Sequence, residues 1–239
     1  MSDTVEIHPP QGYRERPAQL AGAVLWTRDP AADLITPVLP DGSMDLLWID
    51  GRLFIAGPDT RAYHPAAGPS SRIAGIRFYP GTAPALLDVP AHELRDRRVE
   101  LADVWTRADA HRASALITAA PTPAQGLESI AQWRASSSGP ADPILCHVVR
   151  ELRSGAQVSA VAEALELAPR RLHRMSLSAF GYSPKTLARI LRMQRALALA
   201  RAGTPFADTA ARTGYSDQAH LSREIRALAG MSLTQLLHT

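Results

Sequence analysis

The chain has 239 residues, and 46% of them are hydrophobic, which is typical of a globular protein with a core. This length suggests one large domain or two ordinary ones. The sequence has no apolar run of about 18 residues and no secretory signal, and a single cysteine, Cys146, excludes an internal disulfide. We therefore expect a cytoplasmic protein with no membrane partner.

The charge is unevenly distributed along the chain. Residues 141–239 contain 13 Lys and Arg against 7 Asp and Glu, a net charge of +6, whereas residues 1–140 contain 13 against 16, a net charge of −3. A basic segment attached to a mildly acidic one suggests that only the C-terminal part meets a polyanion. Charge alone leaves a chance asymmetry on a solvated surface as the alternative.

The first half of the chain predicts short β-strands. Apolar runs lie between Pro, Gly and Asp residues at 21–28, 34–40, 45–49, 52–57 and 71–80. The Asp50-Gly51 pair between two of these runs predicts a tight hairpin, because both turn positions need positive φ. Several short strands spaced in this way favour a sandwich or a barrel.

The sequence pattern then becomes helical. Residues 101–120 and 124–135 predict helices, and the Ser-, Gly- and Pro-rich segment 136–143 predicts a linker. The expected organisation is a β domain with trailing helices over residues 1–135 and an all-helical domain over residues 144–239.

The segment 204–214 predicts a helix followed by a turn. Thr204 is expected to cap the helix and Pro205 to occupy its first position. Ala210 is followed four residues later by Gly214, which is the helix-turn-helix spacing of a small residue at a helix crossing and a glycine with positive φ in the turn.

The next helix is expected to begin at a capping Ser216 and to end at Gly230. Leu221, Ile225 and Leu228 form its apolar stripe. Its other face carries side chains that can hydrogen-bond, namely Gln218, Ser222, Arg223 and Arg226. Such an edge is what base edges and phosphates require.

Residues 158–181 repeat this layout. Ala162 lies at the expected crossing, residues 166–168 form the turn, Pro169 begins the second helix and Gly181 ends it. Between the units, a helix from Pro184 to Gly203 is predicted, with an apolar side made of Leu187, Ile190, Leu191, Ala198 and Leu199.

Two helix-turn-helix units joined by one helix resemble the arabinose-operon activator (AraC/XylS) family. The matching motifs are RRLHR, GYSPKTLARILRMQRAL and TGYSDQAHLSREIRALAG, within residues 142–239. The resemblance implies that Arg170, His173 and Arg174 read bases from the first unit. It implies that the reading face of the second unit consists of Gln218, Ala219, Ser222 and Arg223. Arg171 and Arg226 complete the expected DNA-binding set, with Arg226 directed at phosphate and Arg223 directed at phosphate more than at a base.

The sequence departs from the family pattern at four positions. Ala168 stands where a capping Ser is usual, Glu166 where glycine often lies in the turn, Ser176 where a core Phe is usual, and Leu233 where a Pro is usual. Three of the four lie in the first unit, which is therefore expected to depart more from ideal geometry.

The family resemblance also implies an N-terminal jelly-roll sensor. Residues 8–135 resemble a recurrent N-terminal domain of actinobacterial regulators, so the expected fold class is α+β, with a cupin-like domain before the double helix-turn-helix domain. Arg77 is a candidate for holding an anionic effector, and an ion pair with Asp41 or Asp45 is the plainer alternative. The histidines before residue 140 form no metal-ligand pairs, so we expect no metal or cofactor.

The expected function is sequence-specific regulation of transcription at promoters. DNA binding is expected to depend on an unknown small-molecule effector or on a homodimer, with RNA polymerase as a partner and activation favoured over repression. A cupin-type enzyme with a helical protein-interaction tail is the alternative. The plainer readings of single residues are a solvated face for Arg170 and Arg174, packing of His220 against the neighbouring helix, and a buried structural thiol at Cys146.

Overall fold

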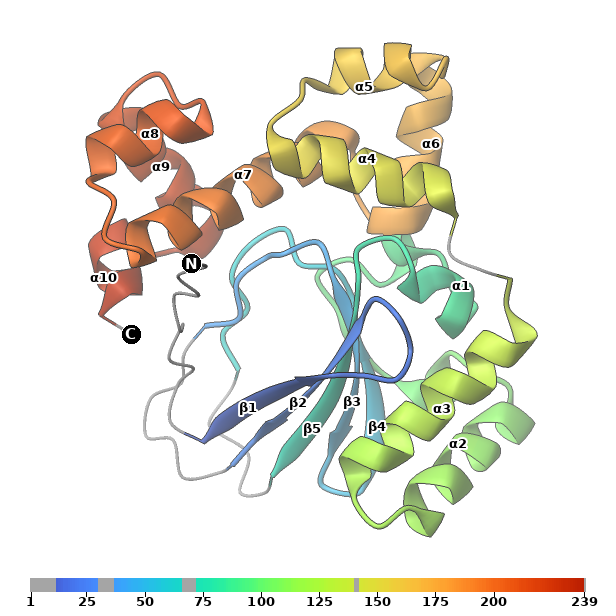
Figure 1. The fold of residues 1–239 in the computed structure, drawn as a ribbon. Helices are drawn as coiled ribbons and strands as arrows, with labels where there is room; N and C mark the ends of the chain where they lie inside the picture. Colours follow the sequence, from blue (N-terminus) through green and yellow to red (C-terminus); the bar gives the residue numbers. More distant parts are fainter. Residues whose placement is uncertain (1–11, 30–36, 66–71, 140–141, 239) are drawn as a thin grey trace, which may run out of the picture.

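The computed structural model describes residues 12–29, 37–65, 72–139 and 142–238. Its first half is built on one antiparallel sheet of six strands in the order β1-β2-β5-β3-β4-β6 (Figure 1). In chain order the strands are β1 (Tyr13–Pro17), β2 (Ala23–Arg28), β3 (Met44–Ile49), β4 (Arg52–Ala56), β5 (Ile73–Phe78) and β6 (Arg98–Glu100).

The predicted hairpin between β3 and β4 is confirmed. Ile49 pairs with Arg52, and the two residues between them, Asp50 and Gly51, have φ of 48° and 83°. Both turn residues are therefore left-handed, as a two-residue hairpin link requires.

Four of the predicted strands correspond to β2, β3, β4 and β5. The segment 34–40 lies partly outside the described residues, and its described part contributes a single bridge, between Val38 and Tyr63. The sequence pattern missed β1 and β6. The sequence of β1, YRERP, has no apolar alternation because the strand is at the edge of the sheet and largely exposed, and β6 has only three residues.

Helices cover one face of this sheet. The helical and 3₁₀ elements after β5 are α1 (Ala83–Leu87), η1 (Ala91–Glu93), η2 (Leu101–Asp103), α2 (Arg107–Ala119) and α3 (Pro123–Ser137). In Figure 1, α3 lies against the sheet and α2 lies outside α3. The inward side chains of the central strands are almost completely buried on this side, including Leu25, Leu46, Ile55 and Ile76.

The α+β class is confirmed, with an antiparallel sheet followed by a helical region. Within the described ranges all six strands belong to a single sheet, and its partner layer is helical. A sheet with one apolar face must bury that face, and here α3 takes the place that a second sheet has in a jelly roll. Residues 101–103, which were predicted as the start of a long helix, form the 3₁₀ turn η2.

One buried carboxylate joins the edge of the sheet to α3. Glu128 of α3 is 5% exposed and accepts hydrogen bonds from Arg16 Nη2 at 3.0 Å and from the Gln19 amide at 2.6 Å. Burial by itself raises the pKa of Glu128, but these donors outweigh it and hold the pKa below its usual value. This contact compensates for the weak apolar pattern of β1.

The second half of the chain is helical. Its elements are α4 (Pro143–Ser154), α5 (Val158–Ala164), α6 (Pro169–Phe180), α7 (Pro184–Arg201), α8 (Phe206–Thr213), α9 (Gln218–Ala229) and α10 (Leu233–Leu237). Figure 1 shows α7 running between the group formed by α4, α5 and α6 and the group formed by α8, α9 and α10. The buried apolar residues of this half form one cluster, separate from the cluster beneath the sheet.

The helix α7 is buried over most of its length, but its apolar side differs from the prediction near the end. Leu187, Ile190 and Leu191 are buried as expected. Ala198 is exposed and Leu199 only half-buried, whereas Leu197 and Ala200 are buried. The helical period of 3.6 residues, continued from Ile190, leads to 197 and 200 rather than to 198 and 199.

The two halves of the chain are in direct contact. Gln194 Nε2 donates to the Pro40 carbonyl at 2.6 Å, and the Ala62 amide donates to the Leu228 carbonyl at 2.7 Å. The guanidinium of Arg153 lies 5.2 Å from the centre of the Tyr79 ring. The helical half therefore rests on loops at one end of the sheet (Figure 1).

We predict that Glu128→Gln lowers the free energy of unfolding by about 1–3 kcal/mol at neutral pH, because Arg16 and the Gln19 amide lose their charged acceptor. A carboxyl with a lowered pKa stabilises the fold above its ordinary pKa, and this contribution disappears as the pH falls through the lowered value. The difference between wild type and variant should therefore begin to shrink near the ordinary carboxyl pKa of about 4.3 and vanish once the pH is below the lowered value.

Urea unfolding from neutral to acidic pH measures this difference. Asp103→Asn is the control, because Asp103 is exposed and its side chain makes no hydrogen bond within the described residues. Equal losses for both variants, or a loss at Glu128 that persists in acid, would contradict the role given to Glu128.

Candidate nucleic-acid interface

The second predicted unit is formed by α8, a turn and α9. Ala210 of α8 is 1% exposed, and Gly214 ends α8 with φ of 78°, so the predicted crossing and turn are both confirmed. The predicted cap at Thr204 is wrong by one residue. The N-cap is Pro205, whose extended backbone precedes the first helical residue, and the Thr204 carbonyl instead accepts from the Thr209 hydroxyl at 3.2 Å.

The cap of α9 is Asp217 and not Ser216 as predicted. Asp217 Oδ1 accepts from the His220 amide at 2.6 Å, and this bond holds the pKa of Asp217 below its usual value. The Ser216 hydroxyl lies 3.0 Å from His220 Nδ1. The His220 ring packs edge-on against Tyr215 in the turn, at 5.3 Å between ring centres, rather than against a neighbouring helix as predicted.

The helix α9 has one buried and one exposed side. Leu221 and Ile225 are fully buried, and Leu228 is 4% exposed. The residues assigned to the reading face are all exposed: Gln218, Ala219, Ser222, Arg223 and Arg226. The side chains of the four polar ones make no hydrogen bond within the described part of the chain. They are available to an external partner.

The first unit, formed by α5 and α6, departs locally from ideal geometry. The turn residue Glu166 has φ of 51°, a left-handed value that glycine adopts more easily. Ala168 is the N-cap of α6 and makes no side-chain cap bond, and Pro169 follows at the first helical position. Leu172 is 2% exposed, so α6 nevertheless docks its apolar side as predicted.

The polar edge of α6 is also open. Arg170, Arg171, His173 and Arg174 are all exposed. None of these four side chains makes a hydrogen bond or ion pair with any residue that the structure describes. Both helices end at a glycine in the left-handed conformation, Gly181 for α6 and Gly230 for α9. Each exposed edge begins at the N-terminal end of its helix.

Two of the family departures are accommodated by local hydrogen bonds or burial. Ser176 is fully buried, and its hydroxyl donates to the Tyr182 carbonyl at 2.7 Å, so no polar group is left unpaired where a Phe is usual. Leu233 is 3% exposed at the start of α10, which is capped by a reciprocal pair between Ser232 and Gln235.

A row of arginines on α7 holds the second unit in place, and sequence reasoning missed it. Arg189 donates to both carboxylate oxygens of Glu224 on α9, at 2.9 and 3.2 Å. The guanidinium of Arg192 lies 4.4 Å from the centre of the Tyr215 ring, and Arg195 donates to the Arg212 carbonyl at 3.2 Å. The spacing of three residues on one helix was the available signal.

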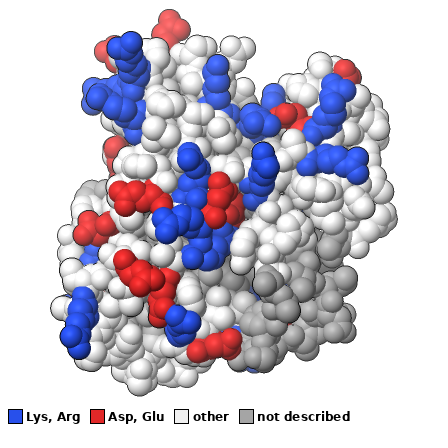
Figure 2. Space-filling view, turned by 180° about the vertical axis from the view of Figure 1, so that it is seen from behind, with Lys and Arg blue, Asp and Glu red and all other residues white. Residues whose placement is uncertain are grey.

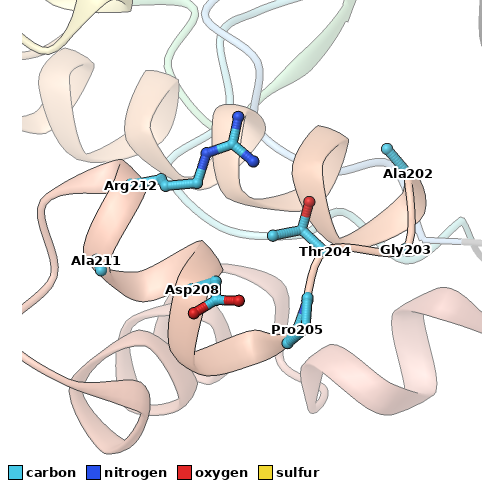
Figure 3. Close-up of a pocket in the computed structure, with 7 residues that line it drawn as sticks. All are labelled: Ala202, Gly203, Thr204, Pro205, Asp208, Ala211 and Arg212. Carbon is cyan, nitrogen blue, oxygen red and sulfur yellow. The ribbon is translucent and has the colours of Figure 1, made fainter.

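Positive side chains lie over both ends of the helical half. Seen from behind, Figure 2 shows Lys and Arg over the part that carries α5 and α6 and over the part that carries α8 and α9, with a group of both signs between them. An open hollow of about 460 Å³ lies at the junction of α7 and α8, with Thr204, Asp208 and Arg212 on its lining (Figure 3). The residues that line the hollow lie at the end of α7 and on α8, and not on the exposed edge of α9.

In the N-terminal half, Arg77 lies among carboxylates. Its guanidinium is 3.4 Å from Asp45, 3.6 Å from Asp41 and 3.3 Å from Glu15. Burial raises the pKa of Asp45, and Arg77 opposes that effect. The geometry agrees with the ion-pair alternative stated for Arg77, since its charge is already balanced.

Three further features of the sequence concern metal binding, Cys146 and membrane helices. The described residues include no group of three or more His, Cys, Asp or Glu placed to hold a metal ion, and His8 lies outside them. Cys146 is half-buried rather than fully buried as predicted. No described helix is long and apolar enough to cross a membrane.

Three solved structures illustrate what the chain is similar to. The C-terminal domain of AraT, a response regulator from Geobacillus stearothermophilus, is 27% identical over 41% of this chain and 85% of that chain, with a TM-score of 0.38. A probable AraC family transcriptional regulator from Rhodopseudomonas palustris is 19% identical over 41% and 96%, with a TM-score of 0.36. ToxT from Vibrio cholerae is 10% identical over 95% and 97%, with a TM-score of 0.46.

Family models match two parts of the chain, whereas no curated protein matches it. Residues 23–100 match a domain of unknown function (DUF6597), and residues 145–239 match a helix-turn-helix domain. The second match covers both units, the helix α7 between them, and both exposed edges described above. This match and the two helix-turn-helix units support a DNA-binding regulator of transcription of the AraC type.

Proposed function

We propose that the chain binds promoter DNA in a sequence-specific manner by placing the N-terminal turns of α6 and α9 in two successive major grooves. The observation that carries this proposal is the state of the two exposed edges. Arg170 and Arg174 on α6, and Gln218 and Arg223 on α9, are exposed and have no side-chain hydrogen bond within the described residues. Guanidinium and amide groups in that state can donate to base edges.

The length of α7 supports binding by both units together. Its 18 residues span about 27 Å, at about 1.5 Å per residue. Major-groove faces on one side of B-DNA recur about every 34 Å. A helix of this length can hold two units over adjacent turns if the DNA bends modestly toward the protein.

The residues of the two edges have different roles in this proposal. Arg174 and Arg170 on α6, and Gln218 and Ser222 on α9, are exposed near the start of their helices and take the base-facing positions. Arg223 is directed at phosphate more than at a base. His173 and Ala219 complete the base-facing surface, and Arg171 flanks it. Arg226 lies two turns into α9, where a guanidinium meets the phosphate backbone rather than a base.

The regulatory part of the proposal rests on the family resemblance. We place an unidentified organic effector in the N-terminal domain, predicted over residues 1–135. The linker to the DNA-binding domain, predicted over 136–143, is shorter than expected, because α3 extends to Ser137 and α4 begins at Pro143. We propose activation through contact with RNA polymerase, with a homodimer as a further means of control. Because carboxylates surround Arg77, an anionic effector would have to compete with them for that guanidinium.

We predict that Arg174→Ala weakens binding to the selected operator by about 1–3 kcal/mol and relaxes one base position, since a base-directed guanidinium is lost. Arg226→Ala should weaken selected and random DNA alike, because phosphates are present in every sequence. The operator is first selected from random-sequence DNA with the full chain, and titrations at fixed salt then measure affinity. Equal losses of the two variants on both kinds of DNA would contradict this division of roles.

We also predict that one protomer protects two base clusters about 10 bp apart in a non-palindromic order, because the two edges differ in sequence. Insertion of about 5 bp between the clusters turns one of them to the far side of the duplex, so protection of one cluster should be lost. Hydroxyl-radical footprinting on native and lengthened sites measures this. Equal affinity and protection at both spacings would show that only one unit engages DNA.

A further inference from the structure

The two reading helices are held from different sides. The helix α6 packs against η1 and α1 of the N-terminal half in addition to its own neighbours α5 and α7. In Figure 1 the C-terminal end of α6 points down onto this part of the N-terminal half. The helix α9, by contrast, packs against α7, α8 and α10 of the helical half.

The contact at the end of α6 is close and leaves no space for additional atoms. A Cβ at Gly81 would lie 2.7 Å from Cε1 of Phe180, and Phe180 is 1% exposed. A Cβ at Gly181, the residue that ends α6, would lie 2.5 Å from Pro58 Cγ and 3.1 Å from the Ala91 carbonyl oxygen. Arg95 donates to the Gly181 carbonyl at 3.3 Å. Dense packing of this kind transmits small shifts instead of absorbing them.

The position of α9 is determined within the helical half. Arg189 of α7 grips Glu224 with two hydrogen bonds, and α8 and α10 cover the buried side of α9. The N-terminal half reaches α9 through a backbone hydrogen bond from Ala62 to the Leu228 carbonyl, at the C-terminal end of the helix and away from Gln218 and Ser222. The N-terminal half therefore packs directly against α6, whereas it reaches α9 through this backbone bond and, by way of α7, through the bond of Gln194 to Pro40.

We propose that the N-terminal half positions the first reading helix through the contact of Gly81 with Phe180, whereas α7 positions the second. This inference rests on the proposed function, since it assigns regulation to one of the two edges. Gly81, Phe180 and Arg95 are positioning residues for base contacts that Arg170 and Arg174 make. A change at the N-terminal half alters reading by α6 and leaves reading by α9 intact.

The test is Gly81→Ala in the full chain, with Gly51→Ala as the matched control. Gly81 and Gly51 have similar φ, 88° and 83°, so both variants carry the same backbone strain. A Cβ at Gly51 meets no atom within 4 Å, whereas a Cβ at Gly81 meets Phe180. Any difference between the variants therefore reports the contact with α6.

Two measurements are made on each variant. Hydrogen exchange followed by mass spectrometry compares amide protection in residues 169–181 with that in residues 218–229 without DNA. Footprinting and titration use the operator selected by the wild-type chain. We expect Gly81→Ala to accelerate exchange only in 169–181, to lose protection of one base cluster, and to bind about tenfold more weakly, as loss of one set of base contacts implies. Gly51→Ala should keep both clusters.

A second substitution separates positioning from general damage. Phe180→Leu removes the ring edge that the new methyl group meets, so adding it to Gly81→Ala should restore protection of the lost cluster. Unchanged or equally accelerated exchange in both helices of Gly81→Ala would overturn the inference, as would failure of Phe180→Leu to restore the cluster. A wild-type chain that selects no operator would contradict the proposed function, while the exchange data would still decide how α6 is held.

Discussion

The arrangement of the helical half depends on the burial of α7. Leu187, Ile190, Met193, Ala196 and Leu197 are fully buried, so one helix supplies the core of both helix-turn-helix units. Each unit alone is too small to bury its own apolar side, and α7 closes both. The same helix sets the distance between the two exposed edges, because its length is rigid at about 1.5 Å per residue. Stability and the spacing of the reading helices therefore come from a single element.

The two units that share this core differ in their helix caps and in their turn residues. The second unit has a side-chain cap at Asp217, a glycine in its turn, and an ion pair between Arg189 of α7 and Glu224 of α9. The first has an uncapped start at Ala168 and a left-handed Glu166 in its turn. Missing caps and strained turns each reduce the stability of a small helical unit. The α6 helix of the first unit also packs against η1 and α1 of the N-terminal half, which adds buried contacts that α9 does not have.

The N-terminal half thus has two surfaces with different tasks. One face of its sheet is buried against α3, which accounts for its stability. The loops at one end of the sheet meet the helical half through short contacts at Pro40, Ala62 and Gly81. Backbone groups and glycines make close approaches here, so the two halves fit tightly without a long salt-bridge network. Such a closely packed interface transmits displacement well.

The sequence by itself determined the elements whose signals are local. Asp50-Gly51 required a tight turn, Pro169 and Pro184 marked helix starts, and Gly181, Gly214 and Gly230 marked helix ends, because these residues restrict φ or permit left-handed values wherever they stand. The exposed edges of α6 and α9 followed from helical periodicity.

Only the tertiary structure decided the rest. Four features depend on which partner lies nearby in space. They are the edge strand β1, the cap at Asp217 in place of Ser216, the ion pair of Arg189 with Glu224, and the packing of Phe180 against Gly81. Those partners are distant in the sequence or compete for the same donor, and no local pattern of residue types encodes the distance between them.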